Sequence, residues 1–116
     1  MIDLKVDESY AYDYLSIMNV KLCAKINRQI IADYNSCYSN ISSQVGESTH
    51  DKIINSLEYK NLEIVNKKIF NAVDKAKKDE VKASIVDNLN YERYLCKKRL
   101  QKKFFNSEQN EIKIGY

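Results

Sequence analysis

Apolar side chains recur every three or four residues along most of this chain, which is the spacing of one face of an α-helix. The first stripe runs from Ala11 to Ile41 and predicts one long helix. Serine and asparagine cluster from Ser36 to Ser43, and because their side chains can bond to the nearby backbone, a bend is expected there. Further stripes from Leu62 to Ala76 and from Val81 to Leu100 predict two more helices.

A few residues mark the boundaries of these helices. Gly46 is the one internal glycine and is expected to end the first helix in a left-handed cap. The segments Ser48 to Asp51 and Asp79-Glu80 have the composition of helix starts, and the polar stretch Glu58 to Asn61 leaves open whether the middle helix continues or turns. Because short connections favour antiparallel neighbours, the pattern predicts an all-α fold, an antiparallel three-helix bundle with its middle helix in one piece or two.

Both ends of the chain alternate apolar and polar residues instead, which is the period of a strand. Met1 to Val6 shows this alternation, and so does Glu111 to Ile114. The two segments could pair as a short terminal β-ribbon lying on the helices, and two unpaired tails are the alternative. With no repeat or linker in between, we expect one helical domain over residues 1–116.

The composition supports helices and limits the function classes. Proline is absent and there are only two glycines, whereas sheet proteins need such residues at their turns. The 19 basic and 16 acidic residues are mixed along the chain and leave a net charge of only +3, so nucleic acid is not expected as a partner. A membrane is not expected either, because no apolar run approaches the roughly 20 residues of a span, and the acidic N-terminus does not resemble a signal peptide.

The cysteines and the single histidine show no catalytic or metal-binding pattern. Cys23, Cys37 and Cys96 are widely spaced and odd in number, which favours reduced thiols in a cytoplasmic protein over a disulfide framework or a zinc site. His50 has no second histidine or nucleophile placed near it in the sequence. We therefore expect a protein that is not an enzyme and that has no metal or cofactor.

Three segments resemble a known group of sequences: DYLSIMNVK at Asp13 to Lys21, LEIVNKKIFNAVDKAKKDE at Leu62 to Glu80, and VDNLNYERYLCKKRL at Val86 to Leu100. They are similar to a loose family of uncharacterised small helical-bundle proteins of bacteria and their phages, some linked with glycan-assembly genes. The resemblance implies a helical bundle, and it covers about two-thirds of the chain. The family's polar positions would be Asp13, Lys21, Asn66, Asp74, Asn90, Arg93 and Lys97. One carboxylate of the family's acidic pair is missing here, where Val73 precedes Asp74.

These polar residues admit a functional and a structural interpretation. Arg93 and Lys97 lie one turn apart and could hold a phosphate, with Asn66 and Asn90 orienting a sugar or base. The candidate ligand-binding residues are Arg93, Lys97, Asn90, Asn66, Asp74 and Lys21. Alternatively, the same side chains form ion pairs and amide bonds between helices, which is the interpretation we favour because buried polar groups must be paired in any case.

The last helix carries two further features. Its basic end, from Lys97 to Lys103, is followed by Phe104 and Phe105 and could bind a nucleic-acid backbone. The interpretation we favour is the ordinary positive end of a helix, with lysines around the solvent face and phenylalanines covering the core. Glu92 falls within the apolar stripe, between Leu89 and Cys96. A carboxylate there must either bond across the bundle or lie where the interface is open.

Three alternating tyrosines, Tyr10, Tyr12 and Tyr14, cannot all face one core on a helix. At least one should be exposed or covered by a partner, and tyrosine is enriched in interfaces. The sequence therefore favours a small cytosolic interaction or accessory protein without enzymatic activity, a homo-oligomer or the partner of another protein. The resemblance implies that a bacterium or a phage encodes it. The alternative is a protein that binds or sequesters a small anionic ligand, a nucleotide or phospho-sugar, through Arg93 and Lys97.

Overall fold

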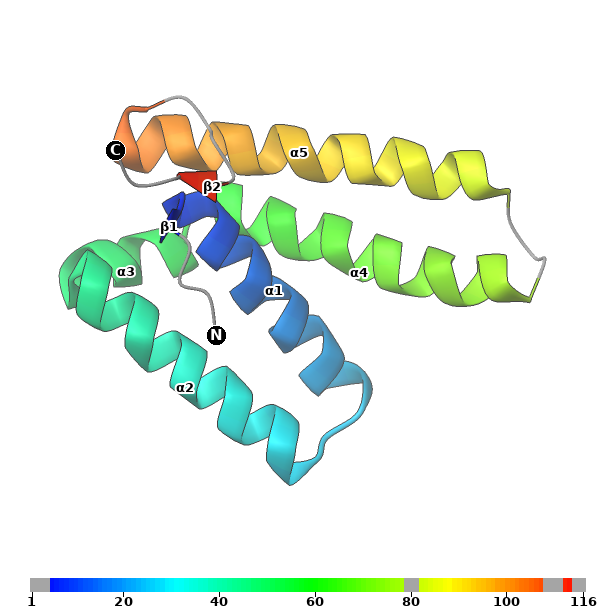
Figure 1. Cartoon of the computed structure of the whole chain (residues 1–116), viewed down its shortest axis with the longest axis horizontal. Coiled ribbons are helices and arrows are strands. Elements are labelled where there is room, and N and C mark those ends of the chain that lie inside the picture. The colour runs from blue at the N-terminus through cyan, green and yellow to red at the C-terminus, as the bar shows by residue number, and fades with distance from the viewer. Residues whose placement is uncertain (1–4, 79–81, 108–111, 114–116) are drawn as a thin grey trace.

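The computed structural model describes residues 5–78, 82–107 and 112–113 of the chain. These residues form an all-α fold, as predicted (Figure 1). Its helices are α1 (Glu8–Ala24), α2 (Arg28–Val45), α3 (Glu47–Ile54), α4 (Leu57–Lys77) and α5 (Ala83–Phe105), and its short strands are β1 (Lys5–Val6) and β2 (Ile112–Lys113). The described residues therefore contain five helices, and the prediction of a three-helix bundle is wrong.

One of the two additional helices arises because the first predicted helix is divided between Ala24 and Arg28. Lys25 and Asn27 are both extended, with φ of −153° and −147°. The side chain of Asn27 accepts a hydrogen bond of 2.8 Å from the backbone N–H of Ile30 and so caps α2. The segment Ser36 to Ser43, where a bend was expected, is helical throughout, because its side chains do not displace the backbone bonds of α2.

Gly46 ends α2 as predicted, with a different geometry. Its φ of 101° is open to glycine at little cost, but its ψ of 136° is extended, so the residue is not in the predicted left-handed cap. Gly46 also serves as the N-cap of α3, which begins at Glu47.

The middle helix lies in two pieces, α3 and α4. The turn between them falls at Asn55 and Ser56, just before the polar stretch Glu58 to Asn61 that had left a turn open. Ser56 Oγ accepts a hydrogen bond of 3.1 Å from the N–H of Tyr59.

The helices form two antiparallel pairs that meet at one end. α4 and α5 lie side by side and extend well beyond the other helices, while α2 runs back along α1 and α3 returns the chain to the start of α4 (Figure 1). α1 contacts both α4 and α5. The expected start of the last helix at Asp79-Glu80 lies outside the described residues, and α5 is described from Ala83.

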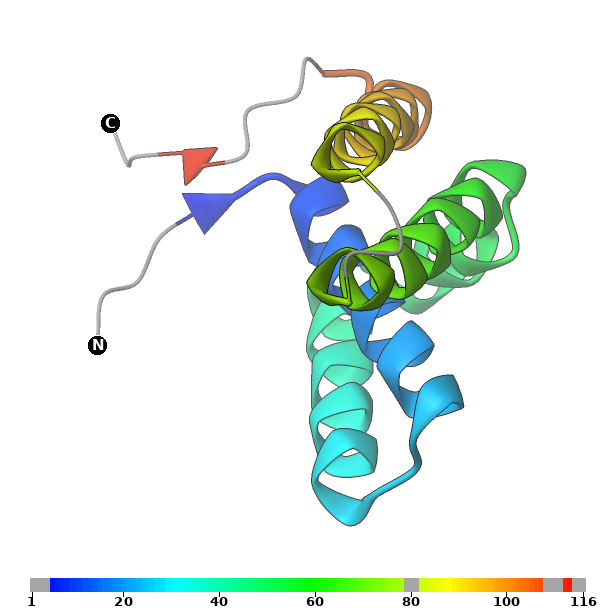
Figure 2. The same cartoon turned by 90° about the vertical axis from the view of Figure 1, so that its right-hand side faces the viewer.

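The predicted terminal ribbon is present over two residues on each strand. Lys5 lies opposite Lys113 and Val6 opposite Ile112 in an antiparallel pair. Figure 2 shows this ribbon standing away from the helices, so it does not lie on them as expected. The remaining residues of the alternation, Met1 to Leu4, Glu111 and Ile114, lie outside the described residues.

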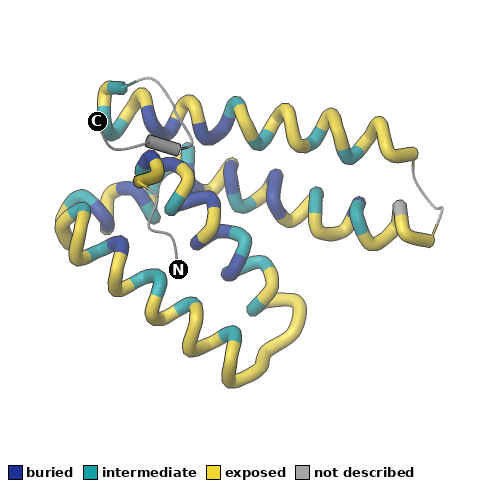
Figure 3. The backbone as a smooth tube through the Cα atoms, in the orientation of Figure 1, coloured by how far each residue is buried: buried dark blue, intermediate teal, exposed yellow. Residues whose placement is uncertain are grey.

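The core lies where the two helix pairs meet. Figure 3 shows buried residues gathered at that end and mostly exposed residues along the far half of the α4–α5 pair. Every helix contributes to it. The buried apolar cluster consists of Tyr12, Leu15, Ile41, Ile53, Tyr59, Leu62, Val65, Cys96 and Leu100.

Candidate functional site

A buried carboxylate, Asp13 of α1, joins three helices. The Arg93 guanidinium of α5 grips it with Nε, which lies 3.0 Å from each carboxylate oxygen, and with Nη2. Asn66 of α4 donates from Nδ2 to Asp13 Oδ1 at 2.9 Å and to Ser16 Oγ at 2.6 Å. Ser16 in turn donates to the backbone carbonyl of Asp13 at 2.8 Å. Three of the polar residues singled out in the sequence therefore meet at one point.

This arrangement holds the helices in register. Asp13 is 2% exposed and Asn66 4% exposed, so each would be costly to bury without its partners. A fork of guanidinium donors fits a carboxylate in one orientation, which fixes the position of α5 along α1. Asp13, Asn66 and Arg93 are thus bonded to one another between helices.

The other candidate ligand-binding residues lie elsewhere. Lys97 is buried, with its ammonium 5.8 Å from the centre of the Tyr10 ring. Lys21 and Asn90 are exposed. Asp74 is exposed as well and pairs with Lys78 at 3.2 Å. Of the six candidates, Asn66, Asp74 and Arg93 share one cleft.

That cleft lies between α1, α4 and α5 and has a volume of about 710 Å³. Its lining combines apolar side chains, three lysines and the outer side of the Asp13 network. The residues are Ile17, Ala24, Lys25, Asn66, Ile69, Phe70, Asn71, Val73, Asp74, Lys75, Lys77 and Arg93. Such a cleft could bind a small molecule whose anionic group contacts the lysines and whose less polar part covers the apolar side chains.

The three tyrosines of α1 separate as their alternation requires. Tyr12 is fully buried in the core, whereas Tyr10 and Tyr14 are 40% and 54% exposed. The two exposed rings line a groove of about 510 Å³ between α1 and α2, opposite residues such as Ser36 and Asn40 of α2. The exposed tyrosine side chains therefore lie on one face of α1, next to a concave surface.

His50, for which the sequence predicted no role, lies fully buried among aromatic rings. Its Nδ1 lies 2.9 Å from the Tyr12 hydroxyl, its ring stacks on Tyr12 at 5.6 Å, and the ring of Tyr38 meets it edge-on at 4.4 Å. Among the described residues, Nε2 has no hydrogen-bond partner. Burial lowers the pKa of His50, against a weaker opposing effect of Asp51. A lone histidine in a predicted turn offered no signal of this environment.

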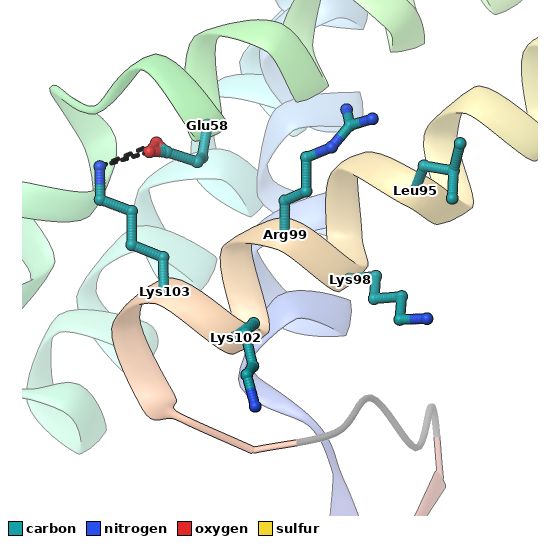
Figure 4. A pocket seen from close by; sticks show the side chains of 6 residues that line it. All are labelled: Glu58, Leu95, Lys98, Arg99, Lys102 and Lys103. Atoms are coloured by element: carbon teal, nitrogen blue, oxygen red, sulfur yellow. Dashed lines mark hydrogen bonds and ion pairs between the residues drawn. The ribbon is translucent and has the colours of Figure 1, made fainter.

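The basic end of α5 lines an open groove of about 590 Å³ beside the start of α4 (Figure 4). Four cations, Leu95 and one carboxylate surround it: Glu58, Leu95, Lys98, Arg99, Lys102 and Lys103. Lys103 pairs with Glu58, and this hydrogen bond lowers the pKa of the Glu58 carboxyl. Glu92, for which the sequence left a bond across the bundle or an open interface as alternatives, is exposed and lines an opening between α4 and α5.

The described residues contain neither a candidate metal-binding group nor a candidate membrane-spanning helix. No group of three or more His, Cys, Asp and Glu side chains there could hold a metal ion. No helix within those residues is both long and apolar enough to cross a bilayer. Comparison of the chain with protein-family models, with curated proteins and with solved structures finds no match.

Proposed function

We propose that this chain is a small interaction protein without enzymatic activity that associates with itself through α1. The observation that carries the proposal is the separation of the α1 tyrosines. Tyr12 is used by the core, while Tyr10 and Tyr14 remain exposed one turn apart. A tyrosine ring offers a large apolar surface and a polar tip at low entropic cost, which is why interfaces are enriched in it.

The surroundings of these tyrosines favour a symmetric pair. The groove between α1 and α2 adjoins both rings. Two apolar side chains are also exposed nearby in the sequence, Val6 of β1 and Ile31 of α2. In a twofold dimer, each copy presents the same patch to the other. A tyrosine of one copy would then occupy the groove of its partner, and both copies would bury apolar surface.

A cytoplasmic location, expected from the cysteines, and a bacterial or phage origin, implied by the family resemblance, belong to the same proposal. Burial raises the pKa of both Cys37 and Cys96, so these thiols stay protonated and poorly reactive. Such thiols need no oxidising compartment.

A second candidate, binding of a small anion, is favoured by the cleft between α1, α4 and α5. Arg93 lines this cleft together with Lys25 and Lys75, over an apolar floor that includes Phe70. A phosphate group could bind at the lysines while a sugar or base covers the floor. In this role Arg93 would be held in position by Asp13.

Native mass spectrometry of gently purified protein separates the two candidates. Self-association predicts multimers of bare chains, which the double variant Tyr10→Ser/Tyr14→Ser converts to monomers. The matched control is Tyr91→Ser/Tyr94→Ser, which removes two exposed tyrosines from α5 instead. A ligand would appear as added mass that is lost on denaturation.

The outcomes are distinct. Unchanged multimers in the α1 variant, with circular dichroism showing an intact fold, would refute the tyrosine interface. A wild-type chain that stays monomeric at high concentration would refute self-association itself. Added mass in the wild type that disappears in Lys25→Ala/Lys75→Ala would support the second candidate, because these lysines lie at the cleft but are exposed and outside the Asp13 network.

A further inference from the structure

One groove on the surface of α5 is strongly cationic. The groove at the end of α5 has four cationic side chains against one carboxylate, a net charge of +3. The whole sequence also has a net charge of +3, so all other residues together sum to zero. The small overall charge argued against a polyanion as partner, but four cationic side chains around one groove create a local positive field.

The cations are displayed along the helix and not buried in it. Lys98 and Lys102 lie one turn apart and leave the same side of α5, and Arg99 points from the other side toward α4 (Figure 4). All three are exposed. Lys103 is engaged with Glu58 across the groove. A row of cations spaced by one helical turn, about 5.4 Å, suits the repeated charges of an extended anion better than a single compact one.

Two exposed aromatic rings continue this row toward the N-terminus of α5. Tyr91 and Tyr94 are 63% and 43% exposed, and their rings stack with centroids 6.2 Å apart and planes inclined by 25°. Tyr91 precedes Lys98 by seven residues, or two turns, so both lie on one face of the helix. From Tyr91 to Lys102 this face is about 16 Å long, at 1.5 Å per residue.

We infer that this face of α5 and the adjoining groove bind single-stranded nucleic acid, with bases stacked on Tyr91 and Tyr94 and two phosphates held by Lys98 and Lys102. A third phosphate contact comes from Arg99 on the other side of the groove. Aromatic platforms beside a cationic groove are the means by which proteins bind single strands without reading their sequence. A duplex keeps its bases stacked internally and would leave the tyrosines unused. An anionic membrane would require apolar side chains among the cations, and Leu95 is the one such side chain in the described lining of the groove.

The test is fluorescence anisotropy of the full chain with a labelled oligothymidine of about 12 nucleotides, titrated over about 50 to 200 mM salt. Three phosphate contacts predict that log K falls with log salt at a slope of about −2. Tyr91→Ala/Tyr94→Ala should weaken binding about tenfold or more and leave this slope unchanged, because stacking releases no counterions. Lys98→Ala/Lys102→Ala should weaken binding and flatten the slope by about 1.4.

Matched controls remove an exposed aromatic ring and two exposed cations from other helices. Phe70→Ala changes α4, and Arg28→Ala/Lys52→Ala changes α2 and α3. Both should bind as the wild type does. Absence of salt-sensitive binding would overturn the inference. Equal oligonucleotide binding by the wild type and the Tyr91/Tyr94 variant would also overturn it. So would tighter binding of the wild type to inorganic polyphosphate, or to mixed phosphatidylcholine–phosphatidylserine vesicles, than to the oligonucleotide.

Discussion

At the scale of single residues, His50 couples the fold to pH. It is the single histidine in the sequence, and burial among Tyr12 and Tyr38 lowers its pKa below the value of about 6.5 expected in the unfolded chain. As pH falls, the unfolded chain therefore takes up this proton first. The contribution of neutral His50 to stability is complete above about pH 6.5 and decreases as the pH drops below that value.

Urea unfolding followed by circular dichroism between about pH 7.5 and pH 5.5 measures this effect. The free energy of unfolding of the wild type should decrease toward acid, by at most about 1.4 kcal/mol per pH unit for one proton. His50→Gln should be less stable throughout, because Tyr12 loses its imidazole partner, yet its stability should be nearly flat over this range. A wild type as insensitive to pH as the variant would show that His50 does not titrate on unfolding.

The sequence singled out seven polar residues but did not reveal which of them contact one another. Asp13, Asn66 and Arg93 were selected from the family resemblance, and they do meet. Lys97 was placed beside Arg93 as a second phosphate ligand, because the two lie one turn apart, yet it is buried against the Tyr10 ring. Helical spacing fixes the face on which a side chain lies, whereas its partner depends on how the helices cross, which no local pattern encodes.

At the scale of elements, the break between α1 and α2 depends on one asparagine. Replacing Asn27 by alanine removes the acceptor for the N–H of Ile30. We expect a loss of about 1 kcal/mol in the free energy of unfolding and faster hydrogen exchange in the first turn of α2. Asn35→Ala, an exposed change in the middle of α2, is the control and should slightly raise stability, because alanine is the better helix former. Equal effects of the two changes would mean that Asn27 is not an effective cap.

The same break explains why the helix count was wrong. The apolar stripe from Ala11 to Ile41 continues in step across Lys25 and Asn27, so periodicity alone could not reveal two helices. Asn27 is a favoured N-cap residue, and it was the available signal. Gly46 was recognised as a helix end because it is the one internal glycine, and glycine tolerates the positive φ that it adopts there. The division of the middle helix was anticipated from the polar residues near it.

At the scale of the whole molecule, the packing is uneven. The last buried residue of α4 is Ala72, the first of α5 is Cys96, and none of the residues whose burial is described between them is buried. The outer half of the α4–α5 pair thus projects from the core and consists mostly of exposed residues, as Figure 3 shows. Phe70 and Ile85 are among its exposed apolar side chains. A helix pair that buries so little apolar surface can open locally without unfolding the core.

Hydrogen exchange measured by mass spectrometry, in dilute and in concentrated protein, tests this picture together with the proposed interface. In dilute protein, amides in the first half of α5 should exchange about 100-fold faster than those near Leu100, since local opening costs less free energy than global unfolding. On concentration, association through α1 should slow exchange near Tyr10 and leave the outer half of α4 and α5 unchanged. Protection gained by that outer half instead would place the contact between copies at Phe70 and Ile85, and would contradict the assignment of the interface to the tyrosines of α1.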